Sequence, residues 1–402
     1  MEFLRDILNK IKPHFERDGR FAKLHSVFDG FESFLFVPNK TSKNGTHIHD
    51  AADSKRTMFV VVLALVPALL FGMYNTGYQH FRALGQDAGF FWTFFYGLLA
   101  VLPVILVSYI VGLSIEFIAA QIRGHAIQEG YLVTGFLIPL IVPVDTPLWM
   151  IAAATAFAVI FAKEVFGGTG MNIFNVALVA RAFLFFAYPT HMSGERVWVR
   201  TKDVFGIGKG ESIDAFSGAT PLGQIGTATG ASADIAGSLG EPLGFLDGII
   251  GLVPGSIGET SVIAIALGAV FLLITKVASW KTMLSVFAGG AIVGVIFNWF
   301  GPDTAVACFP WHMHLVFGGF AFGAVFMATD PVTSARTETG KWIYGFLVGA
   351  LAITIRVLNP GYAEGMMLAI LLMNVFTPLI DFFVVDANIR KRLKRKHLRI
   401  PV

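Results

Sequence analysis

Apolar stretches recur along most of the chain and fall into two sets of five. A regular helix needs about 20 apolar residues to cross the ~30 Å of a membrane's hydrocarbon core. The third and fifth stretches of the first set are shorter than this, so we expect broken or half helices there. The pattern predicts an all-α polytopic membrane protein of about ten transmembrane segments, at about 57–73, 90–122, 131–142, 147–163, 176–188, 259–278, 282–300, 312–328, 342–358 and 364–385.

Three polar regions flank or separate these sets. Residues 1–56 carry apolar positions spaced along one helix face, which predicts a cytoplasmic arm at the membrane interface. The Gly- and Ser-rich region 189–257 contains no convincing span and predicts a large loop, and 386–402 is a basic tail. Ten spans place both termini on one side, and the basic residues at both ends place that side in the cytoplasm, with 189–257 on the outer face.

The two sets also resemble each other in sequence, which predicts two repeats at 57–188 and 258–385. TGFLIPLIVPVDTP (134–147) aligns with GGFAFGAVFMATDPVT (318–333), and the segments 149–172 and 342–367 align after them. A five-span unit that occurs twice must be inverted the second time, an architecture that places broken helices near the membrane midplane. The alternative is a pair of similar Gly- and Pro-interrupted hairpins without duplication.

Composition excludes several classes of protein. Hydrophobic residues make up 55% of the 402 positions and charged residues only 14%, against roughly 25% charged in soluble proteins. Cys308 is the only cysteine, so redox chemistry would need a cofactor other than an iron–sulfur cluster, or another chain. We interpret the basic tail as a topology signal rather than a nucleic-acid site. No metal site is expected, because the pairs His47/His49 and His312/His314 have a spacing that faces apart in a helix.

The segment FGGTGMNIFNVALVARAF (166–183) is the strongest candidate for ligand binding within the spans. Gly167 and Gly168 interrupt the helix and free backbone groups that lipid cannot satisfy. Asn172 and Asn175 offer amide groups suited to a flavin ring edge, and Arg181 could meet a phosphate, a reduced flavin or a carboxylate. The alternative is structural: close helix packing by the glycines and capping by the asparagines.

Two further sets of residues are candidates for chemistry. In DAFSGATPLG (214–223), Ser217, Gly218 and Ala219 leave Thr220 without a bulky neighbour, so that a modifying enzyme could esterify its hydroxyl; a plain surface loop is the alternative. Acidic residues within membrane segments are costly and are ion-path candidates by default; here these are Glu116, Asp330 and Asp381.

Several sequence blocks follow one another along the chain: KEVFGGTGMNIFN, RAFLFFAYP, SGAT, PGSIGE, PWHMHLVFGGFAFG, MATDP, NPGYAEGMMLAILLMN and TPLID. Together they closely resemble the B subunits of the sodium-translocating NADH:quinone oxidoreductases of bacterial membranes. The resemblance runs from about Arg56 to Arg392, with one departure at Val176, where that family usually has proline. The homologous D subunits of the Rnf complexes share part of the pattern, but the long N-terminal arm and the 189–257 loop favour the former.

This resemblance implies an electron path and an ion path. It implies FMN joined to Thr220 by a phosphodiester, attached from the outer face by a flavin transferase, and a non-covalent riboflavin held by the glycine break with Asn172 and Asn175. It further implies ubiquinone reduction around Gly112, Glu116 and the N-terminal arm. A sodium constriction is implied at Phe322 and Phe326, which lie four residues apart on one helix face.

The expected function is therefore that of a membrane subunit of a redox-driven sodium pump in a bacterial inner membrane. Its expected partners are an NADH-oxidising flavoprotein, an FMN-bearing C subunit and small membrane subunits. No side chain of this chain is assigned a catalytic role, because the flavins and the quinone supply the electron chemistry. The alternatives are an Rnf-type electron-transport subunit and a channel or transporter of the same architecture without redox cofactors.

Overall fold

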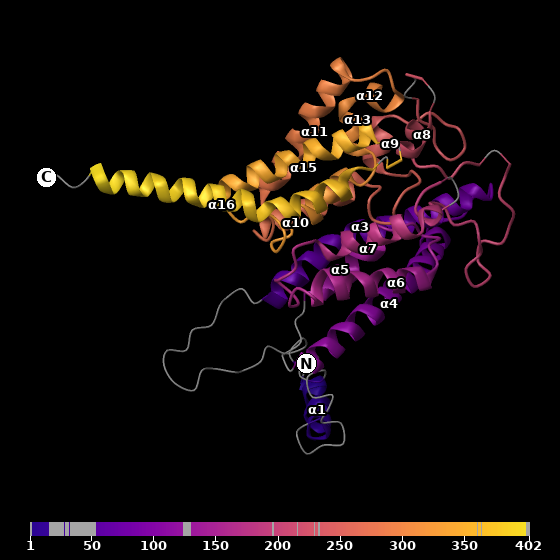
Figure 1. Ribbon diagram of the computed structural model, residues 1–402. Helices are drawn as coiled ribbons and strands as arrows, with labels where there is room; N and C mark the ends of the chain where they lie inside the picture. Colours follow the sequence, from indigo (N-terminus) through magenta and orange to yellow (C-terminus); the bar gives the residue numbers. More distant parts are fainter. Residues whose placement is uncertain are drawn as a thin grey trace.

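The fold is known from a computed structural model, which shows the chain as two packed groups of helices (Figure 1). The α3–α7 half and the α10–α16 half lie side by side, and the end of α16 projects away from both. In the described part of the chain, β structure is limited to two isolated bridges, Val204–Ile207 and Ala236–Pro242. The structure describes residues 2–15, 28, 32, 54–123, 130–194, 197–214, 216–228, 230–231, 234–359, 361–362 and 364–398.

Helices account for each half. The N-terminal part contains α1 (Glu2–Ile11), η1 (Lys12–His14), α3 (Ser54–Ala83), α4 (Phe90–Arg123), α5 (Tyr131–Leu140), α6 (Leu148–Phe157), the π-helix η3 (Ala158–Glu164), α7 (Val176–Ala187) and η4 (Pro189–His191). The connecting loop holds α8 (Pro221–Thr227) and α9 (Phe245–Ile250). The second part contains α10 (Val262–Ile274), α11 (Trp280–Phe300), α12 (Ala305–Cys308), α13 (Trp311–Val316), α14 (Phe320–Phe322), the π-helix η5 (Gly323–Met327), α15 (Glu338–Leu358) and α16 (Met366–Leu398).

Each of the ten predicted segments coincides with helix. Within the described residues, five helices are long and apolar enough to cross a membrane: Arg56–Ala83, Phe90–Arg123, Trp280–Phe300, Glu338–Leu358 and Met366–Arg395. The others are the short helices α5, α7 and α10, the α6–η3 helix and the interrupted run α13–α14–η5. At 10 and 12 residues, α5 and α7 confirm that these two segments are too short to span alone. The chain is an all-helical, multi-pass membrane protein.

The two halves share packing relations. We number the five predicted membrane segments of each half in chain order. In both halves the second segment packs on the third and on the fourth, and the fourth packs on the fifth. The third segment also contacts the first and the fifth in both halves. Glycines permit the closest of these contacts, because a Cβ at Gly349 on α15 would lie 1.9 Å from the Val286 carbonyl oxygen on α11. The shared relations support the predicted repeat, whereas its inverted orientation stays a prediction.

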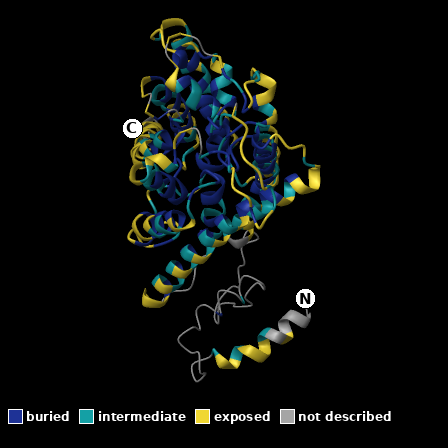
Figure 2. Ribbon diagram, turned by 90° about the vertical axis from the view of Figure 1, so that its right-hand side faces the viewer, coloured by how far each residue is buried: buried dark blue, intermediate teal, exposed yellow. Residues whose placement is uncertain are grey.

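Burial is highest where the two halves meet, and the outward faces are apolar. Figure 2 shows the buried residues in the middle of the molecule and exposed positions along the outer helices. Large apolar side chains on α4 and α11 are exposed, as lipid-facing side chains are expected to be. Examples are Phe91, Ile110, Ile122, Ile296 and Trp299.

The region predicted as a loop, 189–257, covers one end of the bundle. Its polar contacts hold it there, since the two ring nitrogens of His80 lie within hydrogen-bond distance of the carbonyl oxygens of Arg200 and Gly208, which accept, and Ser238 Oγ donates to Gln79 Oε1. Its last part enters the bundle: residues 253–261 are mostly buried, and Gly258 N donates to the Leu140 carbonyl at 2.7 Å. This buried stretch crosses the predicted boundary at 257 and brings Glu259 to the centre of the molecule.

Candidate functional site

Two cavities lie at the two ends of α7. We call the first the Asn175 cavity; it is bordered by Asn175 at the start of α7. We call the second the Thr220 cavity, which has a volume of about 250 Å³ and is bordered by Arg181 and Phe185 further along the same helix. A helix rises 1.5 Å per residue, so Asn175 and Phe185 are separated by about 15 Å along the axis. α7 therefore connects the two candidate sites.

Thr220 lies at the border of the second cavity and is half-buried. It caps α8, since its Oγ1 accepts a hydrogen bond from Gly223 N at 3.0 Å. The loop before it is held in place: Ser217 N donates to the Ser238 carbonyl, and Gln224 Nε2 donates to the Ala219 carbonyl. Ser217 and Ala219 also border the cavity, and Gly218 beside them is buried. This segment is therefore an ordered, hydrogen-bonded part of the fold.

Arg181 is a positively charged residue in the wall of the Thr220 cavity. Its guanidinium forms an ion pair with Glu259 at 2.5 Å and a second one with Glu364. Arg181 and Glu259 are each at least 95% buried, and the Glu364 side chain is 19% exposed. The structure thus places Arg181 with carboxylates beside Thr220, and it does not bring Arg181 into the wall of the Asn175 cavity.

A second arginine and a tyrosine complete this region. Arg356 is fully buried on α15 and donates to the carbonyls of His314 at 2.6 Å and Glu364 at 3.2 Å, which positions the segment before α16. Tyr362, in that segment, is 5% exposed, and among the described residues its hydroxyl has no hydrogen-bond partner. Tyr362 packs edge-on against Phe185 with ring centroids 4.6 Å apart and borders the Thr220 cavity.

The Asn175 cavity lies where the broken segments of the two halves meet. Asn175 caps α7, because its Oδ1 accepts from the backbone N–H groups of Ala177 and Leu178, and its Nδ2 donates to Asp330 at 3.4 Å. Asp330 is held by Val332 N and Thr333 Oγ1. α7 begins at Val176, the position where proline would also suit the first helical turn. The departure at Val176 therefore leaves the start of α7 intact.

Asn172 and Thr169 present polar atoms to the same cavity. Asn172 Nδ2 donates to the Phe174 carbonyl at 3.0 Å, and Thr169 Oγ1 is buried without a partner among the described residues. Gly167 and Gly168 adopt φ angles of 117° and 96° in the turn that ends η3, a backbone conformation that residues other than glycine rarely adopt. The glycines therefore shape the break, while the amide and hydroxyl groups after it face the cavity.

Lys163 connects this cavity with the predicted quinone residues. It borders the Asn175 cavity from η3, its ammonium forms an ion pair with Glu116 on α4, and both side chains are at least 94% buried. The second carboxylate oxygen of Glu116 is buried without a partner in the described part of the chain. Lys163 Nζ also lies 5.7 Å from the centre of the Tyr131 ring, against which Gly112 packs so closely that a Cβ would lie 1.8 Å from a ring carbon.

Phe322 and Phe326 lie together in the wall between the halves. Their ring centroids are 5.0 Å apart, and both are buried. Phe326 borders the Asn175 cavity, as Asp330 does, whereas Phe322 is fully buried next to it. Three predicted ion-path residues are therefore brought into one region.

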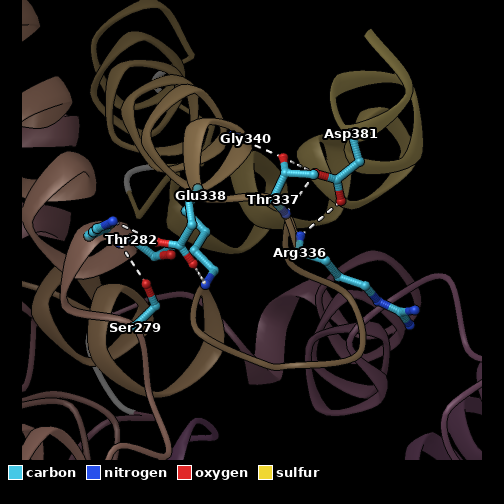
Figure 3. A network of polar contacts seen from close by, with 9 residues as sticks. Ser279, Thr282, Arg336, Thr337, Glu338, Gly340 and Asp381 are labelled. Atoms are coloured by element: carbon cyan, nitrogen blue, oxygen red, sulfur yellow. Dashed lines mark hydrogen bonds and ion pairs between the residues drawn. The ribbon is translucent and has the colours of Figure 1, made fainter. Parts of the chain in front are cut away.

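Asp381 lies elsewhere and holds the turn before α15, whose N-cap is Thr337 (Figure 3). It accepts hydrogen bonds from the backbone N–H groups of Arg336 at 2.8 Å and Thr337 at 3.0 Å and from Thr337 Oγ1 at 2.5 Å. The neighbouring Glu338 pairs with Lys281 and Lys341. Asp381 is thus fully engaged at a helix end, and its predicted place on an ion path stays a prediction.

Sequence reasoning missed the partners of the charged residues it selected. Lys163, Glu259, Glu364 and Tyr362 are all buried or nearly so beside the cavities. The sequence did contain a signal for these residues, since each is a polar residue inside an otherwise apolar or Gly-rich block. The residues that they contact, however, lie far away along the chain. The histidine pair on α13 is split as predicted: His314 is buried against the Val306 carbonyl, whereas the His312 ring packs on Phe245. His47 and His49 lie outside the described residues.

Comparison with known proteins covers nearly the whole chain. The family described as NQR2, RnfD, RnfE matches residues 41–390. The chain is 43% identical to the B subunit of the Na(+)-translocating NADH-quinone reductase of Ectopseudomonas mendocina, over 98% of this chain and 99% of that protein. It is 42% identical to the B subunit of the same enzyme of Azotobacter vinelandii over the same shares, and 41% identical to that of Chromohalobacter salexigens over 98% of this chain and 96% of that protein.

Proposed function

Because the chain belongs to the NQR2, RnfD, RnfE family, we propose that it is the B-type membrane subunit of a sodium-translocating NADH-quinone reductase. The observation that carries this proposal is the near end-to-end similarity to proteins of that name, which includes the N-terminal arm and the 189–257 loop. We place the protein in a bacterial inner membrane with both termini in the cytoplasm. Its partners are the NADH-oxidising flavoprotein, the FMN-bearing C subunit and small membrane subunits.

The Thr220 cavity is the proposed place of a covalent FMN. A flavin needs an attachment hydroxyl, aromatic or apolar walls and polar groups for its ring. Thr220 supplies the hydroxyl, Phe185 and Trp198 supply apolar surface, and Arg181 and Tyr362 supply donors. In this proposal a flavin transferase forms the phosphodiester at Thr220 Oγ1 from the outer face. The bound flavin supplies electron transfer, and the chain positions it and excludes lipid.

The Asn175 cavity is the proposed place of a non-covalent riboflavin. The buried Thr169 hydroxyl, which has no partner among the described residues, is a group that such a ligand would satisfy, and the Asn172 amide also faces the cavity. Lys163 adds a cation next to the cavity, and its ion pair with Glu116 links the cavity to the proposed ubiquinone region around Gly112.

Sodium is the proposed cargo near the same cavity. Asp330 offers carboxylate oxygen, the ligand type that hard cations prefer, and Phe322 with Phe326 forms an apolar constriction beside it. The coupling proposed here is electrostatic: a change of flavin charge in the cavity alters the affinity of nearby oxygen ligands for a cation.

Covalent flavin is tested by ultraviolet fluorescence of the protein on a denaturing gel after co-expression with its flavin transferase. We expect a fluorescent band that is lost in Thr220→Ala and retained in Thr227→Ala, a matched control because Thr227 borders the same cavity on α8. Absence of fluorescence in the unaltered protein would contradict the proposal and favour a channel or transporter without redox cofactors.

The Rnf-type alternative shares the covalent flavin and needs a different test. Quinone reduction by the assembled complex with NADH, stimulated by sodium and not by potassium, is the expected result. Reduction that depends on ferredoxin, or that is indifferent to sodium, would instead favour the Rnf-type protein.

A further inference from the structure

At the border of the Thr220 cavity lies a residue whose buried donor pairs with none of the residues that the structure describes. Tyr362 borders the cavity, and its hydroxyl is buried without a hydrogen-bond partner among the described residues. Its ring is held by the edge-on contact with Phe185, and its chain segment is anchored because Arg356 donates to the Glu364 carbonyl. A buried hydroxyl without a partner is unfavourable unless a ligand atom accepts its hydrogen bond.

The charges around this hydroxyl are of both signs. Arg181 also borders the cavity, but Glu259 and Glu364 both pair with its guanidinium. Glu259 is buried behind Arg181, whereas Glu364 is partly exposed and itself borders the cavity. Among the residues that border the cavity, a ligand therefore meets a neutral donor residue without a partner, Tyr362, and an arginine whose positive charge is offset by a neighbouring carboxylate, Glu364.

We propose that Tyr362 and Glu364 set the reduction potential of the flavin held at Thr220, and this inference rests on the proposed function. A flavin ring gains electron density on reduction, and its ring oxygens then become stronger acceptors. A hydrogen bond from Tyr362 stabilises the reduced form and raises the potential. The carboxylate of Glu364 opposes the accumulation of negative charge and lowers it. The two residues act in opposite directions, and both are positioning residues, not catalytic ones.

Tyr362→Phe in the assembled complex is the primary test, because it removes an oxygen atom that bonds to no described residue. We expect the midpoint potential of the Thr220-linked flavin to fall, with about a tenfold change in the ratio of oxidised to reduced flavin, which is about 59 mV for a one-electron step. The potential is followed by a spectroscopic redox titration, and the signal is assigned by its loss in Thr220→Ala. Tyr188→Phe is the control, since Tyr188 follows α7 at the same end of the bundle but does not border the cavity.

Glu364→Gln should shift the midpoint potential of the flavin in the opposite direction. Loss of its negative charge leaves Arg181 less compensated, so we expect the potential to rise by a similar factor. Unchanged potentials in both variants, or a shift of the same sign in both, would overturn the inference. Fluorescence of the gel band separates the two proposals: a band that persists in Tyr362→Phe with an unmoved potential contradicts only the inference. A band missing from the unaltered protein contradicts the proposed function itself.

Discussion

The two cavities along α7 are each built around a buried cation, but the protein balances these cations differently. In the Thr220 cavity one guanidinium, that of Arg181, is shared by two carboxylates from distant segments. Beside the Asn175 cavity one ammonium, that of Lys163, faces one carboxylate, that of Glu116. The first arrangement ties a loop and the start of α16 to α7, whereas the second joins a π-helix to α4 within the bundle.

We infer that the ion pairs have different roles in the two cavities: structural in the Thr220 cavity and electrostatic in the Asn175 cavity. The Thr220 cavity is bordered largely by loop segments, and the ion pairs of Arg181 join the segments of Glu259 and Glu364 to α7. The Asn175 cavity is formed by helix breaks and capped helix ends, which are held by their own backbone hydrogen bonds. We therefore infer that its ion pair is not needed to hold the wall together and that its charges act on a bound ligand. This comparison predicts different responses to the loss of each cation.

The largest effect is expected for Arg181→Met. It leaves the buried Glu259 and the partly exposed Glu364 without their ion pairs, and breaking a buried ion pair such as that of Glu259 costs about 3–5 kcal/mol. Thermal unfolding of the detergent-solubilised complex measures the loss. Addition of Glu259→Gln to this variant should restore only part of the stability, because Glu364 stays unpaired. Arg390→Met is the control, since the Arg390 and Asp386 side chains are 75% and 35% exposed in their pair on α16, and we expect a change of about 1 kcal/mol or less there.

The stability lost in Lys163→Met should be restored by one second substitution, whereas the stability lost in Arg181→Met should not. The single variant leaves Glu116 unpaired and buried, but the double variant Lys163→Met with Glu116→Gln removes both charges and should return to within about 1 kcal/mol of the original stability. The double variant should still bind less non-covalent flavin, measured after acid extraction, while its covalent flavin band is unchanged. Failure of the second substitution to restore stability would remove the distinction between the cavities.

The membrane segments could be predicted from the sequence because their signal is local. An apolar run of about 20 residues is sufficient evidence of a span, and the short runs at α5 and α7 were recognisable by their length alone. Asn175 was similarly accessible, since an asparagine before an apolar run is a typical helix cap. These features depend on neighbours within a few residues.

The walls of the cavities could not be predicted in the same way. Arg181 meets Glu259 and Glu364, which are 78 and 183 residues away along the chain. Lys163 was read as part of a motif, but its partner Glu116 lies 47 residues earlier. The hydrogen bonds of Asp381 were equally inaccessible, because its carboxylate accepts from the backbone of Arg336 and Thr337, which are 45 and 44 residues away, and its place on an ion path stays a prediction. Pairing at such separations depends on the tertiary fold.

Asn175→Ala is expected to have a moderate effect confined to one cavity. It removes the cap of α7, which costs about 1 kcal/mol, and the donor to Asp330. Asn175→Asp keeps a capping oxygen but places a second carboxylate next to Asp330, so stability and non-covalent flavin content should both fall further. Both variants should retain the covalent flavin band. A loss of that band would show that the cavities are not independent along α7.

The smallest effect on stability is expected from Glu241, in the loop that carries Thr220. This effect depends on pH. Burial alone would raise the pKa of Glu241, but backbone N–H groups, including that of Leu239, and the Arg82 guanidinium hold this pKa below its ordinary value. A carboxyl with a lowered pKa in the folded state contributes stability above its ordinary pKa, and that contribution is lost as the pH falls through the folded-state value. The Glu241 side chain is 37% exposed, so we expect its share to stay below about 1 kcal/mol.

Glu241→Gln should therefore lower the unfolding temperature slightly at pH 7 and leave it nearly unchanged at a pH below the folded-state pKa of Glu241. Because Glu241 accepts from Leu239, and Ser238 beside it accepts from Ser217, the same change should loosen the Thr220 segment and not the Asn175 cavity. Limited proteolysis of the loop at the two pH values measures this. Equal cleavage of the variant and the original protein at pH 7 would mean that the loop is held without Glu241, and the ion pairs of Arg181 would then be the main support of the Thr220 cavity.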